Sequence, residues 1–235
     1  MKRLILIFTI LLIPLTTIAQ TVEEYLEKGR SKYQKGDYKI AIQNYSKAIQ
    51  LNPDNSFAYN YRGLAKHFLG DYKGAIQDYN KAIELNPNYA EAYYSRGIGK
   101  IKIGDYSGVI QDLNKAIELN PKYTDVYLTI GASKYKLGDY RGAIQDFNKA
   151  IQINPNDANL YVTRSYAKGS LKDLRGAIQD LNKAIQLNPN YAEAYSSRGL
   201  AKLALLEKES GCLDLSKAGE LGYIKAYDSI KELCQ

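Results

Sequence analysis

The feature that most constrains this chain is an Asn-Pro pair that recurs at a constant spacing. The prolines of these pairs are Pro53, Pro87, Pro121, Pro155 and Pro189, so each pair lies 34 residues after the one before it. Because proline disfavours a helical conformation at the residue before it, each pair predicts the end of one structural unit. A fixed period of this length indicates an array of similar units that bury their apolar surfaces against one another.

Each unit carries the pattern of two amphipathic helices. In the second unit, Tyr59 and Gly63 precede Ala75, Tyr79 and Ala82, at spacings that place them on one face of each helix. The small residues predict where the two helices approach closely, and the tyrosines fill the space beside them. The Gly-Asp-Tyr at 70–72 predicts the turn, since glycine can end one helix in a left-handed conformation and aspartate can cap the next.

This pattern resembles the tetratricopeptide repeat, a unit of roughly 34 residues with an aromatic at position 4, small residues at 8, 20 and 27, and proline at 32. Its first aromatic matches Tyr25, Tyr59, Tyr93, Tyr127, Tyr161 and Tyr195. The resemblance covers about residues 22 to 222 and implies an all-α fold, a right-handed superhelical solenoid of antiparallel helical hairpins. The expected repeats are 22–53, 54–87, 88–121, 122–155, 156–189 and a degenerate 190–222, followed by a C-terminal capping helix at 223–235.

The segment 1–19 has the pattern of a secretory signal peptide. Two basic residues precede an apolar stretch at 4–15, and the small residues at 17–19 predict cleavage after Ala19. An uncleaved anchor is the alternative, but the apolar stretch is interrupted by Pro14 and is shorter than the roughly 20 residues that a membrane span needs. We expect a periplasmic or secreted protein with no stable membrane span after cleavage.

The fifth and sixth repeats depart from the pattern. Ser165 replaces the first-helix glycine, Lys172 replaces the turn glycine and Leu174 replaces the turn tyrosine. We expect this turn to be less well fixed, through sequence drift or as a local hinge. The sixth repeat lacks the Gly-Asp-Tyr turn, and Ile224 to Cys234 has the pattern of an amphipathic helix that covers the exposed end of the core.

Both cysteines, Cys212 and Cys234, lie in this C-terminal part. Cys212 precedes a turn near Gly222 by almost the same distance along the chain as Cys234 follows it, so two antiparallel helices would bring them level. In an oxidising compartment we favour a disulfide over two buried thiols.

Composition and charge weigh against several classes of function. The chain is 45% hydrophobic and 24% charged, which predicts a folded protein. The charges alternate without a long basic run, so we expect no nucleic-acid partner. His67 is the only histidine and no phosphate-binding loop occurs, so we expect neither an enzyme, nor a cofactor, nor a metal site.

Arginines recur on the first helices and aspartates on the second. The arginines leave open a basic stripe for an anionic ligand, but we favour ion pairs within each hairpin. The predicted pairs are Arg62 with Asp78, Arg96 with Asp112 and Arg164 with Asp180. Ile130 interrupts the series opposite Asp146.

In the tetratricopeptide family, positions 2, 5, 9 and 12 of the first helix line the concave face. Here these positions differ between repeats and are mostly apolar or aromatic in the middle of the array. The candidates for a ligand groove are Asn60, Leu64, His67, Tyr94, Ile98, Ile101, Leu128, Tyr135, Val162 and Tyr166. The resemblance implies an exported module that binds a peptide or helix of a partner protein in this groove. The alternative is a structural scaffold or a self-associating component of an envelope assembly.

Overall fold

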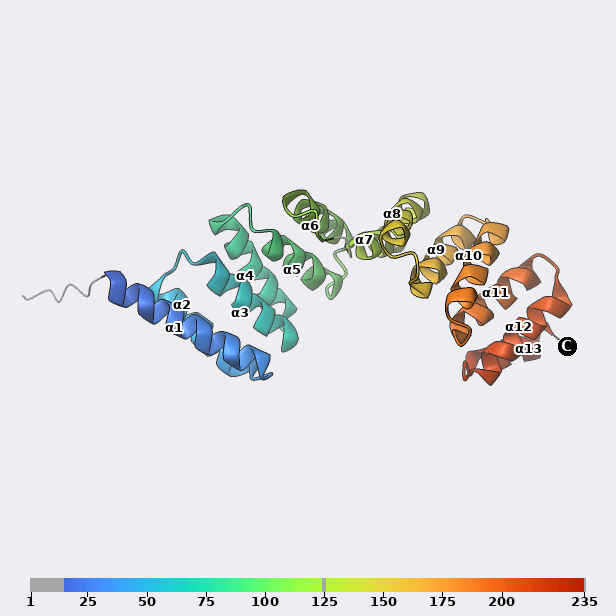
Figure 1. Ribbon diagram of the computed structural model, residues 1–235, viewed down its shortest axis with the longest axis horizontal. Helices are drawn as coiled ribbons and strands as arrows, with labels where there is room; N and C mark the ends of the chain where they lie inside the picture. The colour runs from blue at the N-terminus through green and yellow to red at the C-terminus, as the bar shows by residue number, and fades with distance from the viewer. Residues whose placement is uncertain (1–14, 124–125, 235) are drawn as a thin grey trace, which may run out of the picture. The chain divides into compact units, whose positions relative to one another are not determined.

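The computed structural model describes residues 15–123 and 126–234, whose regular structure is thirteen α-helices with no strand (Figure 1). The helices form two compact units, one ending at Ile103 and the other beginning at Gly104. The all-α fold that the repeat pattern predicts is therefore confirmed.

Unit 1 consists of antiparallel helices in sequential contact. Its helices are α1 (Leu15–Gln34), α2 (Tyr38–Leu51), α3 (Ser56–Phe68), α4 (Tyr72–Leu85) and α5 (Ala90–Ile101). Helix α1 packs on α2 and α3 packs on α4, while α2 also contacts α3 and α4 contacts α5. Each hairpin thus covers the next, as expected for repeats that are not stable singly.

Unit 2 continues the same arrangement. Its helices are α6 (Tyr106–Leu119), α7 (Val126–Lys136), α8 (Tyr140–Ile153), α9 (Ala158–Ser170), α10 (Leu174–Leu187), α11 (Ala192–Ala204), α12 (Lys208–Glu220) and α13 (Lys225–Leu233). The pairs α7 and α8, α9 and α10, and α11 and α12 form hairpins, and each second helix packs on the following first helix.

The turns within the hairpins have a left-handed residue at their centre. Gly36, Gly70, Gly104 and Gly138 occupy it with φ between +76° and +83°. Lys172 adopts the same conformation with φ +65°. The amide of Lys172 donates to Gly169 O at 2.9 Å, as that of Gly138 donates to Tyr135 O at 3.0 Å. The fifth turn therefore keeps the left-handed centre of the others. It differs in one hydrogen bond: the amide of Tyr140 donates to Gly138 O at 3.0 Å, whereas the amide of Leu174 makes no such bond to Lys172 O.

The first-helix glycines allow a close approach of the two helices in a hairpin. A Cβ atom on Gly63 would lie 2.6 Å from Cε1 of Tyr79 and 3.1 Å from Ala75 O. Tyr79 is fully buried, and Tyr45 and Phe147 hold the same place beside their own hairpins' glycines. The predicted roles of the small and aromatic positions are thus confirmed.

A buried ion pair links three consecutive helices at several repeats. Arg164 on α9 donates through Nε and Nη2 to Asp180 on α10, at 2.9 and 2.6 Å, and through Nη1 to Asn148 on α8, at 2.6 Å. Lys168 adds a second cation 2.9 Å from the same carboxylate, which is 4% exposed. Arg198 repeats the arrangement with Asp214 and Asn182.

Arg62 binds Asp78 in the same bidentate way, at 2.9 and 2.7 Å, and reaches back to Ser46. Two of the three predicted pairs, those of Arg62 and Arg164, are therefore confirmed. The third, Arg96 with Asp112, would join residues of different units and stays a prediction.

The C-terminal end differs from the expected cap. Helix α13 buries Ala226, whereas Ile224 and Tyr227 are 78% and 56% exposed. The ring of Tyr227 lies over Gly219, where a Cβ would approach it to 2.8 Å. Because α13 is short and packs through a small residue, most of its apolar side chains stay in contact with solvent.

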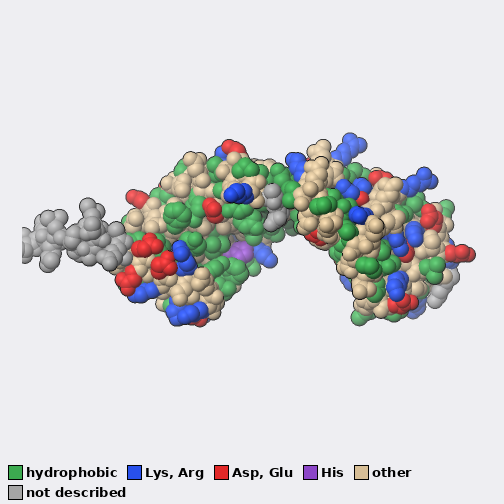
Figure 2. Space-filling view, viewed as in Figure 1, with side chains coloured by type: hydrophobic (Ala, Val, Ile, Leu, Met, Phe, Trp, Pro, Cys, Tyr) green, Lys and Arg blue, Asp and Glu red, His purple; other side chains and the backbone are tan. Residues whose placement is uncertain are grey.

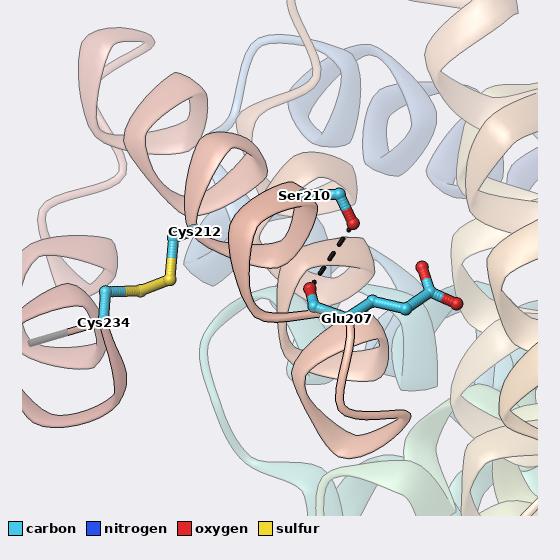
Figure 3. Close-up of a disulfide and its surroundings, with 4 residues drawn as sticks. All are labelled: Glu207, Ser210, Cys212 and Cys234. Atoms are coloured by element: carbon cyan, nitrogen blue, oxygen red, sulfur yellow. Dashed lines mark hydrogen bonds between the residues drawn. A yellow bond between two sulfur atoms is a disulfide. The ribbon is translucent and has the colours of Figure 1, made fainter.

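A disulfide joins α12 to the end of α13. Cys212 and Cys234 are bonded, with their Cα atoms 5.8 Å apart (Figure 3). Near the start of the same helix α12, the hydroxyl of Ser210 donates to the backbone carbonyl of Glu207 at 3.4 Å. The crosslink thus connects α13 to the last hairpin, in addition to the contact at Ala226.

The expected leader lies mostly outside the described residues. Helix α1 begins at Leu15 and runs through the predicted cleavage point to Gln34. None of the helices within residues 15–123 and 126–234 has the length and apolar character needed to cross a membrane. Cleavage after Ala19 stays a prediction.

Candidate functional site

In unit 1, four of the predicted groove residues meet in one pocket. Leu64 and His67 reach it from α3, and Tyr94 and Ile98 reach it from α5. The pocket has a volume of about 160 Å³. Its other lining residues are Phe68, Tyr79 and Ser95. Positions 9 and 12 of one first helix and 5 and 9 of the next therefore form a continuous, mainly apolar wall.

His67 belongs to this apolar wall as a neutral side chain. Its ring lies 5.2 Å from that of Tyr72 and 5.8 Å from that of Phe68. Burial, together with the nearby positive charge of Lys102, lowers the pKa of His67 below its ordinary value. At neutral pH the imidazole is therefore uncharged and can contact an apolar ligand group.

Two of the unit 1 candidates lie outside this pocket. Asn60 is only 2% exposed and donates from Nδ2 to the hydroxyl of Tyr89 at 3.3 Å. It holds α3 to the loop before α5, so it does not lie on an open groove as the repeat position suggests. Ile101, the last residue of α5, is half-buried and is not part of the pocket lining.

In unit 2, Tyr135 on α7 and Tyr166 on α9 share a larger pocket of about 390 Å³. Its wall is completed by α9, α10 and α11, through Ser165, Gly169, Ser170, Leu174, Ala177, Leu181, Ser197, Leu200, Ala201 and Ala204. A second hollow of about 190 Å³ is also lined by these two tyrosines. Tyr135 and Tyr166 therefore border two depressions.

The hydroxyl groups around the larger pocket are fixed by hydrogen bonds. Tyr166 donates to Glu193 Oε1 at 2.7 Å and lies 3.2 Å from Ser197 Oγ. Ser170 donates to the hydroxyl of Tyr135 at 3.3 Å. Burial raises the pKa of Tyr166 well above its usual value, so this hydroxyl stays protonated and the pocket wall stays neutral.

Two candidates in unit 2 contribute to the core. Val162 is 1% exposed and packs in a cluster with Tyr161, Leu181 and Ala184. Leu128 is half-buried against the cluster around Phe147. Val162 is therefore covered by its neighbours, whereas Leu128 keeps part of its side chain exposed and stays a predicted groove residue.

The large pocket includes residues that the groove pattern does not identify. Ser197, Leu200, Ala201 and Ala204 come from the sixth repeat, whose sequence was interpreted as degenerate. Gly169 lies at position 12, where other repeats carry a large side chain such as Tyr135. The loss of a large side chain at this position is the signal in the sequence that could have identified the pocket.

The cations of the first helices do not form an open anion site in the repeats where their contacts are described. Arg62, Arg164 and Arg198 each have their side chain bound to a buried aspartate. Lys66 and Lys168 bind the same carboxylates and also reach backbone carbonyls. Among the described residues, no group of three His, Cys, Asp or Glu side chains is placed to hold a metal ion.

Comparison with known proteins identifies the repeats. Family models described as TPR repeat match residues 29–69, 67–98 and 165–205, and models described as tetratricopeptide repeat match residues 90–123 and 124–157. The chain belongs to the tetratricopeptide repeat family. A comparison of this tetratricopeptide repeat protein with curated proteins found no match.

Several solved tetratricopeptide repeat structures are similar to it. MamA is 28% identical with a TM-score of 0.69, over 74% of this chain and 96% of MamA. A tetratricopeptide repeat protein from Parabacteroides merdae is 30% identical with a TM-score of 0.59, over 91% of this chain and 82% of that one. YrrB is 21% identical with a TM-score of 0.69, over 80% and 97% of the two chains, and shows a shared fold.

Proposed function

We propose that this tetratricopeptide repeat protein is an exported interaction module that binds a peptide or helix of a partner protein on the first-helix face of its repeats. The observation that carries the proposal is a pair of open, mainly apolar pockets, one in each unit, lined by consecutive first helices. Repeats of this kind present extended binding surfaces and are typically scaffolds for interaction rather than catalysts. YrrB, which shares the fold, is described as having an unusual peptide-binding site.

The side chains around the pockets support an uncharged, apolar contact with the partner. Tyr94 and Ile98 in unit 1 and Tyr166 and Leu200 in unit 2 present partly exposed apolar surface. Aromatic and aliphatic anchors of this kind, set in pockets, usually supply most of the binding energy of a protein interface. Figure 2 shows hydrophobic side chains at the surface of both units, interspersed with charged ones.

Capture of partners from an envelope extract tests the binding surface. The full chain is compared with Tyr94→Ala and with Leu200→Asp, which alter one pocket each. Ile40→Ala and Leu213→Asp are the matched controls, because Ile40 and Leu213 are 42% and 70% exposed and line neither pocket. The proposal expects proteins that are captured by the full chain and both controls but lost with a pocket variant. Identical captured sets for all five proteins would contradict it.

Export is supported by the N-terminal sequence and is compatible with the disulfide between Cys212 and Cys234. Cell fractionation with mass measurement of the mature chain tests it. The expected product starts at Gln20 and lies outside the cytoplasm. A full-length chain in the cytoplasmic fraction would contradict export.

Self-association is the alternative that the exposed side chains of α13 favour. Ile224 and Tyr227 form an apolar surface at the end of unit 2. Light scattering of the purified chain, with Ile224→Asp as the comparison, separates the two functions. A monodisperse monomer at high concentration contradicts self-association, whereas an oligomer that dissociates with Ile224→Asp supports it.

A further inference from the structure

A cluster of three aromatic rings fills the junction between the first two repeats. The rings of Tyr33 and Tyr38 are 5.4 Å apart, and that of Phe68 lies 5.7 Å from the first and 5.1 Å from the second. Tyr33 and Tyr38 flank the turn of the first hairpin, and Phe68 ends the first helix of the next repeat. The turn side of this junction is thus occupied by side chains of the chain itself.

The same three positions carry small or aliphatic residues at the junction between the fifth and sixth repeats. Four repeat periods further along the chain, Tyr33 corresponds to Gly169, Tyr38 to Leu174 and Phe68 to Ala204. All three rings are therefore missing together.

These three replacements all line the 390 Å³ pocket. A Cβ atom built on Gly169 would meet nothing within 4 Å, so the space beside it is open. Part of the pocket thus lies beside the three positions whose equivalents carry aromatic rings between the first two repeats. Since a cavity of about 150 Å³ already holds benzene, the pocket can accommodate a phenol or indole ring.

The wall of the pocket suits an aromatic ring with a polar edge. Tyr135 and Tyr166 present ring surface, and Leu181 and Leu200 present aliphatic surface. The hydroxyls of Ser170 and Ser197 lie in the same wall, where a phenol hydroxyl or an indole N–H could bind them. No charged side chain lines the pocket, which disfavours an ionic group.

We propose that this pocket binds an aromatic side chain, tyrosine or tryptophan, of the bound partner segment, in the place that Tyr33, Tyr38 and Phe68 fill between the first two repeats. The inference rests on the proposed function, because it takes the ligand to be a polypeptide. It adds the class of residue that the partner must present. An aromatic guest contacts the two tyrosine rings edge to face or offset, which an aliphatic guest cannot do.

Amino-acid amides measure this preference without a known partner. N-acetyl-tyrosinamide, N-acetyl-tryptophanamide and N-acetyl-leucinamide are titrated into the ¹⁵N-labelled full chain, and the amide signals of Gly169, Ser170, Ser197 and Ala201 are followed. We expect weak, saturable binding of the two aromatic amides, at roughly 3- to 10-fold lower Kd than the leucine amide. Equal affinity for the three amides, or no shift at these four positions, would overturn the proposal.

Gly169→Phe is the matched variant, because it restores a large side chain where the pocket is open. We expect it to fold as well as the parent, since the new Cβ meets no atom, and to abolish the aromatic-specific shifts. Ala204→Phe fills the same space from α11 and serves if the first variant loses its far-UV circular dichroism. Aromatic binding that persists in a folded filled variant would also refute the proposal.

Failure of this inference can be told apart from failure of the proposed function. If the partner is still lost with Tyr94→Ala or Leu200→Asp but the amides show no aromatic preference, the groove binds a polypeptide through other side chains. If neither effect is seen, both the proposed function and this inference fail.

Discussion

Replacing Lys172 by glycine should stabilise unit 2. Lys172 holds the left-handed position of its turn with φ +65°, where four other turns have glycine. This conformation costs a residue with a side chain about 1–2 kcal/mol. Glycine loses about 0.5–1 kcal/mol more conformational entropy on folding than other residues do. The difference predicts that Lys172→Gly raises the free energy of unfolding by about 0.5–1 kcal/mol.

The reciprocal variant Gly138→Lys provides the matched control in the preceding hairpin. Its turn has φ +83° at Gly138, and the amides of Gly138 and Asp139 make the same two hydrogen bonds as those of Lys172 and Asp173, so the variant should lose a similar amount of stability. Urea unfolding followed by far-UV circular dichroism gives the two midpoints. Because repeat arrays can unfold in parts, hydrogen exchange in α9 and α10 shows whether the change is local.

The two variants together can refute the reasoning. Suppose that Lys172→Gly leaves the urea midpoint unchanged or lowers it, while Gly138→Lys lowers the stability. Backbone strain at Lys172 then does not reduce the free energy of unfolding. If Gly138→Lys leaves the free energy of unfolding unchanged, a side chain at the left-handed position of the turn does not destabilise the protein. Only opposite changes of similar size support the argument.

Three further predictions concern groups whose surroundings the structure defines. Asp180→Ala should lower the free energy of unfolding by about 2–4 kcal/mol, because it leaves two partly buried cations without their carboxylate. Urea unfolding measures this change, and the Asp180→Asn variant should lose less stability than Asp180→Ala. Reduction of the Cys212–Cys234 disulfide, which closes a loop with a sequence separation of 22, should destabilise α13 by about 3 kcal/mol, and hydrogen exchange with and without reductant would show no difference if the bond were absent. Burial and Lys102 lower the pKa of His67, so the unfolded chain binds a proton first as the pH falls below about 6.5. The stability of unit 1 should then decrease with acidification, and a His67→Gln variant with the same pH profile would contradict this.

Much of the fold could be predicted from the sequence because each repeat contains the residues that form its own helix contact and helix cap. Gly63 opens a close contact that Tyr79 fills, and Asp71 caps α4 by accepting from the amide of Gly74 at 2.9 Å. The fifth turn shows the limit of this local argument. Lys172 predicts a looser turn, but this residue keeps the left-handed conformation of the glycines, and the amides at 172 and 173 keep their hydrogen bonds. The turn differs from the glycine turns in lacking the hydrogen bond to the carbonyl of its left-handed residue.

The site was only partly predictable, for reasons of packing. Helical spacing brings Leu64 together with Ile98, but it cannot tell that Tyr89 covers Asn60. Exposure at a given repeat position depends on the size of side chains on the following helix and loop. Val162 is buried for this reason although it occupies a groove position.

The 390 Å³ pocket of unit 2 was harder to predict because it depends on large side chains that are absent at three positions. Gly169, Leu174 and Ala204 lie on three different helices, and none of them is unusual alone. The space that they leave together is recognised only by comparing this junction with that of the first two repeats, where the same positions carry aromatic rings.

The arginine links set a rule for how such an array can change in length. Asn148 lies 16 residues before Arg164 in the sequence and Asp180 lies 16 residues after it. Arg198 has the same separations from its partners Asn182 and Asp214. Insertion or deletion of a few residues within this segment would remove a carboxylate from its guanidinium on one side or an amide on the other. A duplicated block of one whole repeat period would instead bring its own partners into register at both ends. The protein can therefore gain or lose whole repeats by tandem duplication far more easily than it can tolerate a single added residue inside one of them.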